Sequence, residues 1–330
     1  MFNIFLNKLW YVKKNEPYYR FYLLVSICFL PISGLYFIIV TIRSTLYKYQ
    51  IFSTTQFQKP VVVIGNSVIG GQGKTPLTIF LANELMLKGF KVGVVGSGYK
   101  SKTSSLHNVQ PDSSPSVVGD EALLIARSTR ASVVIGKDRV KATQKLIEEN
   151  VDFILHDDGL DHFKLSRDIE IIVSKKKIYN DIISDNLNIC RLLPSGPWRS
   201  LDMHRALNTK RENIDVEYEI YQVTNSIDKL KISIDDFSQK IIHLVLGIAL
   251  PDIIKNELME KGYTVICHFY EDHHSFNGTE INFNDNFPVF VTMKDYMKLE
   301  NYQNNNLWIM EHRYKNEKIM KNLLERITKI

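Results

Sequence analysis

Apolar and polar positions along the chain predict strands and helices in alternation. The β-branched run at 61–64 indicates a buried strand, and apolar positions recur at helical spacing between 77 and 87. The pairing of strand and helix returns in the strand "KVGVV" (91–95), a helix starting near 119–121, the strand "ASVVIG" (131–136), the helix "KDRVKATQKLIEEN" (137–150) and a strand at 152–156. This alternation predicts an α/β fold, with a parallel sheet flanked by helices and functional loops at the carboxyl ends of its strands.

The second half of the chain has a less regular pattern. After the strand "IEIIVS" (169–174) and the turn-rich "RLLPSGPWRS" (191–200), residues 201–240 are polar and indicate no clear element. A hydrophobic strand at 241–250 then opens a second α/β region, which runs through "YTVICHF", "PVFVT" and "LWIM" to a lysine-rich terminal helix. We therefore expect a hydrophobic N-terminal segment (1–50), a main α/β core (51–200) and a smaller C-terminal α/β domain (201–330).

Composition and charge narrow the class of partner. The 330 residues are 45% hydrophobic, which suffices for one large core or two modest ones. A net charge of +5 favours anionic partners such as a nucleotide, a phospholipid or a phosphosugar, but basic and aromatic residues do not interleave as in nucleic-acid-binding chains. The three cysteines, Cys28, Cys190 and Cys267, are too scattered for a disulfide framework or a zinc motif, which fits a reducing cytoplasm. No obligate protein partner is inferred.

The segment "GGQGKTP" (70–76) carries the strongest chemical signal. A strand that leads through glycines into a helix points several backbone N–H groups and the positive helix end at one spot. The glycines let the backbone wrap an anion, Lys74 supplies a cation, and the hydroxyl of Thr75 can bind Mg²⁺. Val68 replaces a glycine of the usual P-loop pattern, yet every phosphate-contacting group remains. The predicted nucleotide-binding residues are Gly70, Gly71, Gln72, Gly73, Lys74, Thr75 and Pro76.

The N-terminal segment predicts membrane attachment. Residues 21–42 carry no charge and are long enough to cross a bilayer. The basic residues that precede them would keep the N-terminus in the cytoplasm, so a single span would export the P-loop away from ATP. Pro31 and Gly34 allow a bent or interfacial hairpin that stays on one face of the membrane. A buried core helix pair is the alternative, against which the tyrosine-rich borders argue.

Two acidic pairs are candidates for metal binding and catalysis. Asp157 and Asp158 follow an apolar strand, where a P-loop enzyme needs a carboxylate for Mg²⁺ or its water shell, although a solvated turn is the simpler alternative. Asp120 and Glu121 stand at a predicted helix start. They either cap the helix and interact with its dipole, or they orient an attacking hydroxyl and assist the metal. Spacing alone leaves both interpretations open.

The segment "EDHHSF" (271–276) gathers Asp272, His273 and His274 after a predicted strand. A metal centre or a phosphoesterase signature is conceivable, but such phosphoesterases need further aspartate motifs and no P-loop. A histidine that orients a carboxylate fits a phosphotransferase better. Surface histidines without a role are the remaining alternative.

In their order along residues 60–295, these motifs resemble one family, the tetraacyldisaccharide 4′-kinases of lipid A biosynthesis. The hydrophobic N-terminal segment also matches. The residues that carry the resemblance are "GGQGKTP" (70–76), "GYK" (98–100), "GDEALLIAR" (119–127), "DR" (138–139), "DDGLDH" (157–162), "RLLPSGPWR" (191–199) and "DHHSF" (272–276). The combination is specific, whereas any one motif alone is not.

The resemblance implies a kinase that uses ATP and Mg²⁺ at the cytoplasmic face of a Gram-negative inner membrane, as a peripheral or monotopic protein. It would phosphorylate the 4′-hydroxyl of tetraacyldisaccharide 1-phosphate to give lipid IVA, in a P-loop NTPase-like fold whose C-terminal domain contributes to the active site. By position, Lys74 and Thr75 would bind phosphate and Mg²⁺, and Asp120 paired with His273 would activate the hydroxyl. Further implied ligands are Glu121, Asp157 and Asp158 for the metal, and Tyr99, Arg139, His162 and Arg199 for the lipid headgroup.

Several residues depart from the family pattern. Ser97, Asp161, Ser200 and Met293 replace an arginine, a glutamine and two glutamates. They lie mostly in the implied substrate pocket, so they bear on the acceptor more than on the reaction type. Two other classes stay open: a membrane-associated P-loop ATPase switch and an inactive kinase-like scaffold. Ile69 argues against the switch, which usually has a lysine at that position.

Overall fold

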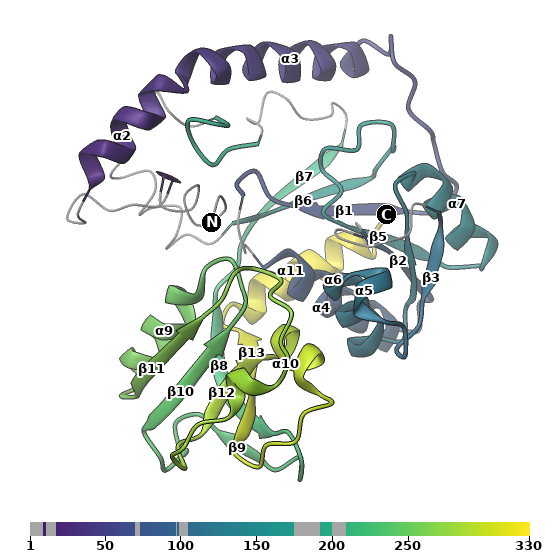
Figure 1. Cartoon of the computed structure of the whole chain (residues 1–330). Helices are drawn as coiled ribbons and strands as arrows, with labels where there is room; N and C mark the ends of the chain where they lie inside the picture. The colour runs from purple at the N-terminus through teal and green to yellow at the C-terminus, as the bar shows by residue number, and fades with distance from the viewer. Residues whose placement is uncertain are drawn as a thin grey trace.

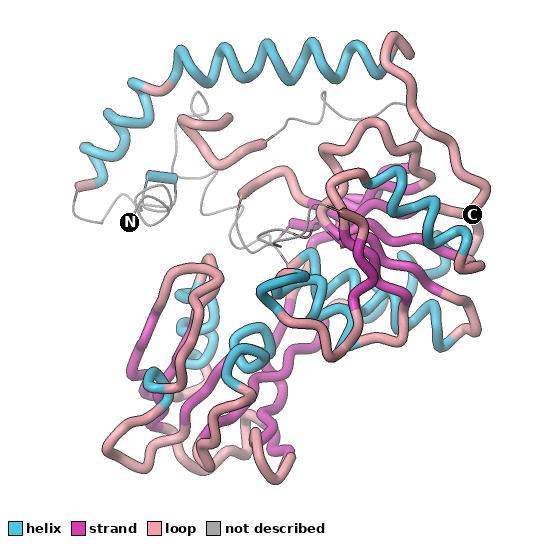
Figure 2. Tube along the Cα trace, turned by 45° about the vertical axis from the view of Figure 1, so that its right-hand side comes forward, coloured by secondary structure: helices cyan, strands magenta, loops and turns pink. Residues whose placement is uncertain are grey.

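The computed structural model describes residues 9–10, 18–69, 73–96, 98, 105–174, 192–199 and 209–330. In these residues two sheets lie one beyond the other, each with helices packed against it, and two N-terminal helices form an arc over the first sheet (Figures 1 and 2). The predicted α/β fold is confirmed.

The first sheet has seven strands among the described residues, in the order β3-β4-β2-β5-β1-β6-β7. All of its pairings are parallel except that of β3 with β4. The strands are β1 (Val61–Gly65), β2 (Val92–Gly96), β3 (His107–Val109), β4 (Ser132–Ile135), β5 (Phe153–Asp157), β6 (Ile169–Ser174) and β7 (Lys210–Asp215).

Helices cover both faces of this sheet. They are α4 (Lys74–Leu87), α5 (Pro115–Val118), α6 (Asp120–Ser128) and α7 (Arg139–Glu148). Successive side chains of β1 point to opposite faces: Ile64 packs with α4 and α6 in one core, whereas Val63 packs with α7 in the other. Because both faces are buried, β1 reads as an unbroken apolar run in the sequence.

The second sheet has six strands among the described residues, in the order β11-β10-β12-β13-β8-β9. The four from β11 to β13 pair in parallel, and β8 and β9 add antiparallel to the edge. The elements are β8 (Tyr218–Asn225), β9 (Lys231–Ser233), β10 (Ile241–Leu246), α9 (Pro251–Glu260), β11 (Thr264–Phe269), η2 (Thr279–Ile281), β12 (Val289–Thr292), α10 (Met293–Leu299), β13 (Leu307–Tyr314) and α11 (Glu317–Ile327).

The two sheets do not divide the chain at residue 200. The strand β7 pairs with β6 and therefore belongs to the first sheet, although its sequence "KRENID" is polar. The last helix, α11, returns to the first sheet, where Met320 and Leu323 join the core that contains Leu77 of α4. Two elements from beyond residue 200 therefore belong to the first sheet: the strand β7 and the helix α11, which packs against it.

The N-terminal arc consists of α2 (Tyr19–Cys28) and α3 (Leu30–Lys48). The helices break at Phe29, with Pro31 in the first turn of α3 and Gly34 inside it, so the segment is bent and is not the predicted hairpin (Figure 1). By length and composition α3 could cross a membrane. Only 11% of its most apolar window is buried inside the protein, whereas a core helix would be mostly buried. The alternative of a buried core helix pair is therefore wrong.

Candidate active site

The P-loop ends at the start of α4. Gly73 is the N-cap of this helix and adopts a left-handed conformation with φ 87°, which favours glycine. The ammonium of Lys74 lies 2.8 Å from Asp158 Oδ1 and donates to Asn66 Oδ1 over 3.2 Å. Pro76 stands in the first turn of α4, where the absent N–H of proline costs no helix hydrogen bond. Gly70, Gly71, Gln72 and Tyr99 lie outside the described residues.

Asp157 is buried at the carboxyl end of β5, directly beside α4. Its Oδ2 accepts a hydrogen bond from Thr75 Oγ1 at 2.9 Å, and its Oδ1 accepts one from Thr78 Oγ1 at 3.1 Å. Burial, followed by the charge of Glu121, raises the pKa of Asp157 to about 7, against the opposing effect of Lys74. A bound cation would favour the charged form of such a carboxylate.

The neighbouring Asp158 is held by two cations. It adopts a left-handed conformation with φ 56°, and Arg199 Nη1 lies 3.3 Å from its Oδ2. Burial opposes its ionisation, but Lys74 and Arg199 outweigh burial and lower the pKa of Asp158. Asp158 is thus ionised beside the P-loop lysine.

The oxygen atoms of Thr75 and Asp157 suit Mg²⁺, which needs few protein ligands, better than a metal ion that is held by several side chains. Among the described residues, no three His, Cys, Asp or Glu side chains are grouped to hold one ion. Mg²⁺ is commonly held by one or two carboxylates together with substrate phosphates and water. The Thr75 hydroxyl and the Asp157 carboxylate, with Glu121 and Asp158 nearby, meet that smaller requirement.

Asp120 and His273 meet although 153 positions separate them in the chain. Asp120 opens α6 beside the first sheet, and His273 follows β11 of the second sheet. His273 Nδ1 lies 3.0 Å from Asp120 Oδ2, and Lys298 Nζ of α10 lies 2.9 Å from the same oxygen. Burial opposes ionisation of Asp120, but the hydrogen bonds from His273 and Lys298 outweigh it and lower the pKa to about 2. The pair therefore joins the two sheets across an ionised carboxylate.

Lys294 and Lys298 are site residues that the sequence reasoning missed. Both lie on α10, four residues apart and so on one helix face. Lys294 Nζ lies 3.1 Å from Asp272 Oδ1 and 3.5 Å from His273 Nε2. The available signal was two lysines at helical spacing directly after a parallel strand, because the carboxyl ends of such strands carry functional residues.

The candidate headgroup residues occupy different environments. Arg199 is near the surface and binds Asp158, as described above. Arg139 is 4% exposed, and its guanidinium donates to Val95 O at 2.9 Å and Asp157 O at 3.3 Å. His162 is partly buried, and burial with the charge of Arg139 lowers its pKa to about 4. Arg139 therefore braces the ends of β2 and β5, and a headgroup contact by its side chain stays a prediction.

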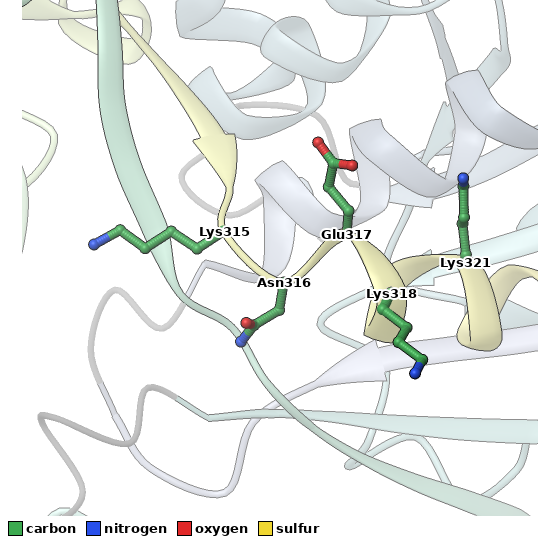
Figure 3. Close-up of a pocket in the computed structure, with 5 residues that line it drawn as sticks. All are labelled: Lys315, Asn316, Glu317, Lys318 and Lys321. Carbon is green, nitrogen blue, oxygen red and sulfur yellow. The ribbon is translucent and has the colours of Figure 1, made fainter.

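An open hollow at the start of α11 is separate from these residues. It is lined by Lys315, Asn316, Glu317, Lys318 and Lys321 (Figure 3). Their side chains diverge, with Glu317 and Lys321 on one side of the helix and Lys318 on the other (Figure 3). None of the predicted site residues lines this hollow.

The family model for tetraacyldisaccharide-1-P 4′-kinase matches residues 25–329. The chain belongs to this family. A tetraacyldisaccharide 4′-kinase of Ruthia magnifica subsp. Calyptogena magnifica is 32% identical over 304 residues, which cover 87% of this chain and 92% of the relative. One of Coxiella burnetii (strain CbuK_Q154) is 35% identical over 283 residues, which cover 84% of this chain and 83% of the relative.

The tetraacyldisaccharide-1-P 4′-kinase family also includes a solved structure of similar fold. It is the "apo" form of LpxK from Aquifex aeolicus in complex with ATP, with a TM-score of 0.71 and 26% sequence identity, covering 92% of this chain and 99% of that one. Family membership confirms the predicted kinase function and enzyme class. The roles of individual site residues stay predictions.

Proposed function

We propose that this family member transfers the γ-phosphate of ATP to the 4′-hydroxyl of tetraacyldisaccharide 1-phosphate at the cytoplasmic face of the bacterial inner membrane. The observation that carries the proposal is the position of Asp120. Its Oδ2 is contacted by His273 and Lys298, both from the part of the chain that forms the second sheet. Its neighbour Glu121 is close enough to Asp157 to raise the pKa of that carboxyl. In this proposal the acceptor side, at Asp120, would lie next to the nucleotide side, at Asp157.

On the nucleotide side, Gly73, Lys74 and Thr75 open α4 and would receive the phosphates. The ammonium of Lys74 contacts Asp158 and Asn66, which lie at the carboxyl ends of β5 and β1. From this edge of the sheet it would compensate negative charge on the transferred phosphoryl group. Mg²⁺, when bound by Thr75 and Asp157 with help from Glu121 and Asp158, would supply further positive charge at the phosphates. Asp158 and Arg199 would keep the lysine within reach of that position.

On the acceptor side, Asp120 would receive the hydrogen of the attacking hydroxyl. Its low pKa keeps it ionised, and an ionised carboxylate can accept that hydrogen bond and orient the nucleophile. His273 fixes the direction of one oxygen, and Lys298 holds it from α10. Arg199, His162, Arg139 and Tyr99 remain our candidates for binding the lipid headgroup.

The membrane contact would use the outer side of the N-terminal arc. Its inner side is polar: Ser33 Oγ lies 2.8 Å from Ser195 Oγ, and Tyr36 Oη donates to Arg199 O at 2.6 Å. Its outer side exposes large apolar residues, namely Phe21, Leu24, Ile27, Ile32, Leu35, Ile38, Ile39 and Ile42. A helix with one face bound to the protein and one apolar face free suits an interfacial position rather than a crossing.

Phosphate transfer tests the proposal directly. We expect labelled γ-phosphate to pass from ATP to purified tetraacyldisaccharide 1-phosphate in detergent micelles, and chelation of Mg²⁺ to abolish labelling. A reaction without the acceptor is the control, since turnover there would indicate an ATPase switch. ATP binding without labelling of the lipid would contradict the proposal and indicate a scaffold.

Membrane attachment has its own test. Replacing Leu35, Ile39 and Ile42, which lie on one face of α3 and are each more than half exposed, with aspartate is expected to abolish flotation with vesicles of anionic phospholipid. The reason is that three charges on this face would have to enter the apolar part of the interface. The matched control is Leu87→Asp at the end of α4, where leucine is 81% exposed and lies outside the arc. Unchanged flotation of the triple variant would contradict the interfacial placement.

A further inference from the structure

The connections between the two sheets run side by side. The chain passes from β7 into β8 at residues 216–217 and from β13 into α11 at residues 315–316. Tyr218 of β8 stands opposite Tyr314 of β13 in antiparallel register, and Lys315 N donates to Glu217 O at 3.0 Å. The two sheets are therefore joined covalently at this pair of strands.

The two tyrosines at this point reach the P-loop. Tyr218 Oη donates to Gly73 O at 2.8 Å, and the hydroxyl of Tyr314 lies 3.1 Å from that of Tyr218. Because Tyr218 uses its only hydroxyl hydrogen on Gly73, Tyr314 donates to Tyr218. The ring of Tyr314 also packs edge-on against Phe80 of α4, at 5.0 Å between ring centroids. Burial raises the pKa of both hydroxyls, so they remain donors across the physiological range.

The contact leaves no room for a larger residue at Gly73. A Cβ added there would lie 2.5 Å from Tyr218 Oη, and the left-handed φ of 87° would strain it as well. Gly73 O also accepts the helix hydrogen bond of Leu77 N at 3.2 Å. The carbonyl at the turn thus has one partner from its own helix and one from the other sheet.

The direction of this carbonyl is linked to the direction of the Lys74 N–H. The peptide bond between Gly73 and Lys74 is planar and trans, so its C=O and its N–H point in opposite directions. The N–H belongs to Lys74, the first residue of α4, and has no partner within the helix. Holding Gly73 O from the side of Tyr218 therefore aims the Lys74 N–H toward the opposite side, where an anion at the helix N-terminus would bind. Glycine alone would permit other orientations.

We propose that Tyr218, held by Tyr314, is a positioning residue for the phosphate-binding turn and makes the geometry of that turn depend on the placement of the second sheet. The inference rests on the proposed function. The same sheet delivers His273 and Lys298 to Asp120. The position of this one sheet therefore bears on both the nucleotide side at Gly73 and the acceptor side at Asp120.

The variant Tyr218→Phe tests this, because it removes the hydroxyl and keeps the ring. We expect the Kd for ATP, measured by calorimetry without acceptor, to rise about tenfold, and kcat/KM for ATP to fall by a similar factor. The KM for the lipid acceptor should stay within about twofold of wild type. Tyr314→Phe should shift ATP binding in the same direction by a smaller factor, since it removes only the bond that holds Tyr218.

A second tyrosine of β8 gives the matched control. Tyr221 donates to Glu311 Oε2 at 3.1 Å, away from the P-loop, so Tyr221→Phe should leave ATP binding unchanged. Wild-type ATP affinity in Tyr218→Phe would overturn the inference, as would a lower Tm with unaltered kinetic constants. If wild-type protein binds ATP but does not label the lipid, the proposed reaction fails, and the calorimetric comparison still decides the role of Tyr218.

Discussion

Replacing Lys74 with alanine is expected to lower kcat about 10³-fold, with little change in the fold. The ammonium is the cation placed at the start of α4, and its loss would leave the developing charge on the phosphoryl group uncompensated. Asp158 would still be paired with Arg199 at 3.3 Å, so the substitution does not strand a buried charge. The measurement is γ-phosphate transfer at saturating ATP and acceptor, with the melting temperature recorded alongside.

Lys88→Ala provides the matched control for this variant. Lys88 is the exposed C-cap residue of the same helix and should tolerate the change without loss of rate. A Lys74 variant with a near-normal rate would remove the basis for a P-loop in this chain.

The second large effect is expected for Asp120→Ala, with a fall in kcat of about 10²-fold or more and an unchanged Kd for ATP. Asp120 receives His273 and Lys298 on one oxygen and would orient the acceptor hydroxyl, so its loss affects the chemical step. Kinetics with both substrates varied, together with calorimetric ATP binding, separate the two quantities.

His273→Ala and the double variant extend this test. Because the two residues would act as a unit, the double variant should be little slower than Asp120→Ala alone. If the loss of kcat in the double variant equals the product of the losses in the two single variants, the two residues act independently. A loss of ATP affinity in Asp120→Ala would instead indicate that this carboxylate acts on the nucleotide and its metal ion, not on the acceptor.

The main sheet and the P-loop could be predicted because each is marked by a short, continuous stretch of sequence. The run at 61–64 is apolar at every position since both faces of β1 are buried, and the glycines precede Lys74 within a few residues. Asp157 was predictable for the same reason, as the residue that ends a buried strand. Family resemblance, rather than spacing, joined Asp120 to His273 across 153 positions.

Other features had no local signal. The strand β7 is polar because it pairs with β6 at the edge of the first sheet, and an edge strand needs few apolar residues. The bond from Tyr218 to Gly73 joins residues 145 positions apart, so no window of sequence contains it. The three buried positions of α2 and α3 are serines, which a hydropathy pattern treats as breaks in an apolar segment rather than as its contact face.

The return of α11 to the first sheet bears on how the protein is made. Met320 and Leu323 complete a core that also contains Leu77 and Leu123, so the ribosome must finish nearly the whole chain before that core can close. The N-terminal arc, in contrast, precedes both sheets in the chain and emerges before them. With the proposed membrane contact, its apolar side would reach the bilayer while the sheet beneath it is still incomplete, and the kinase would finish folding at the membrane surface.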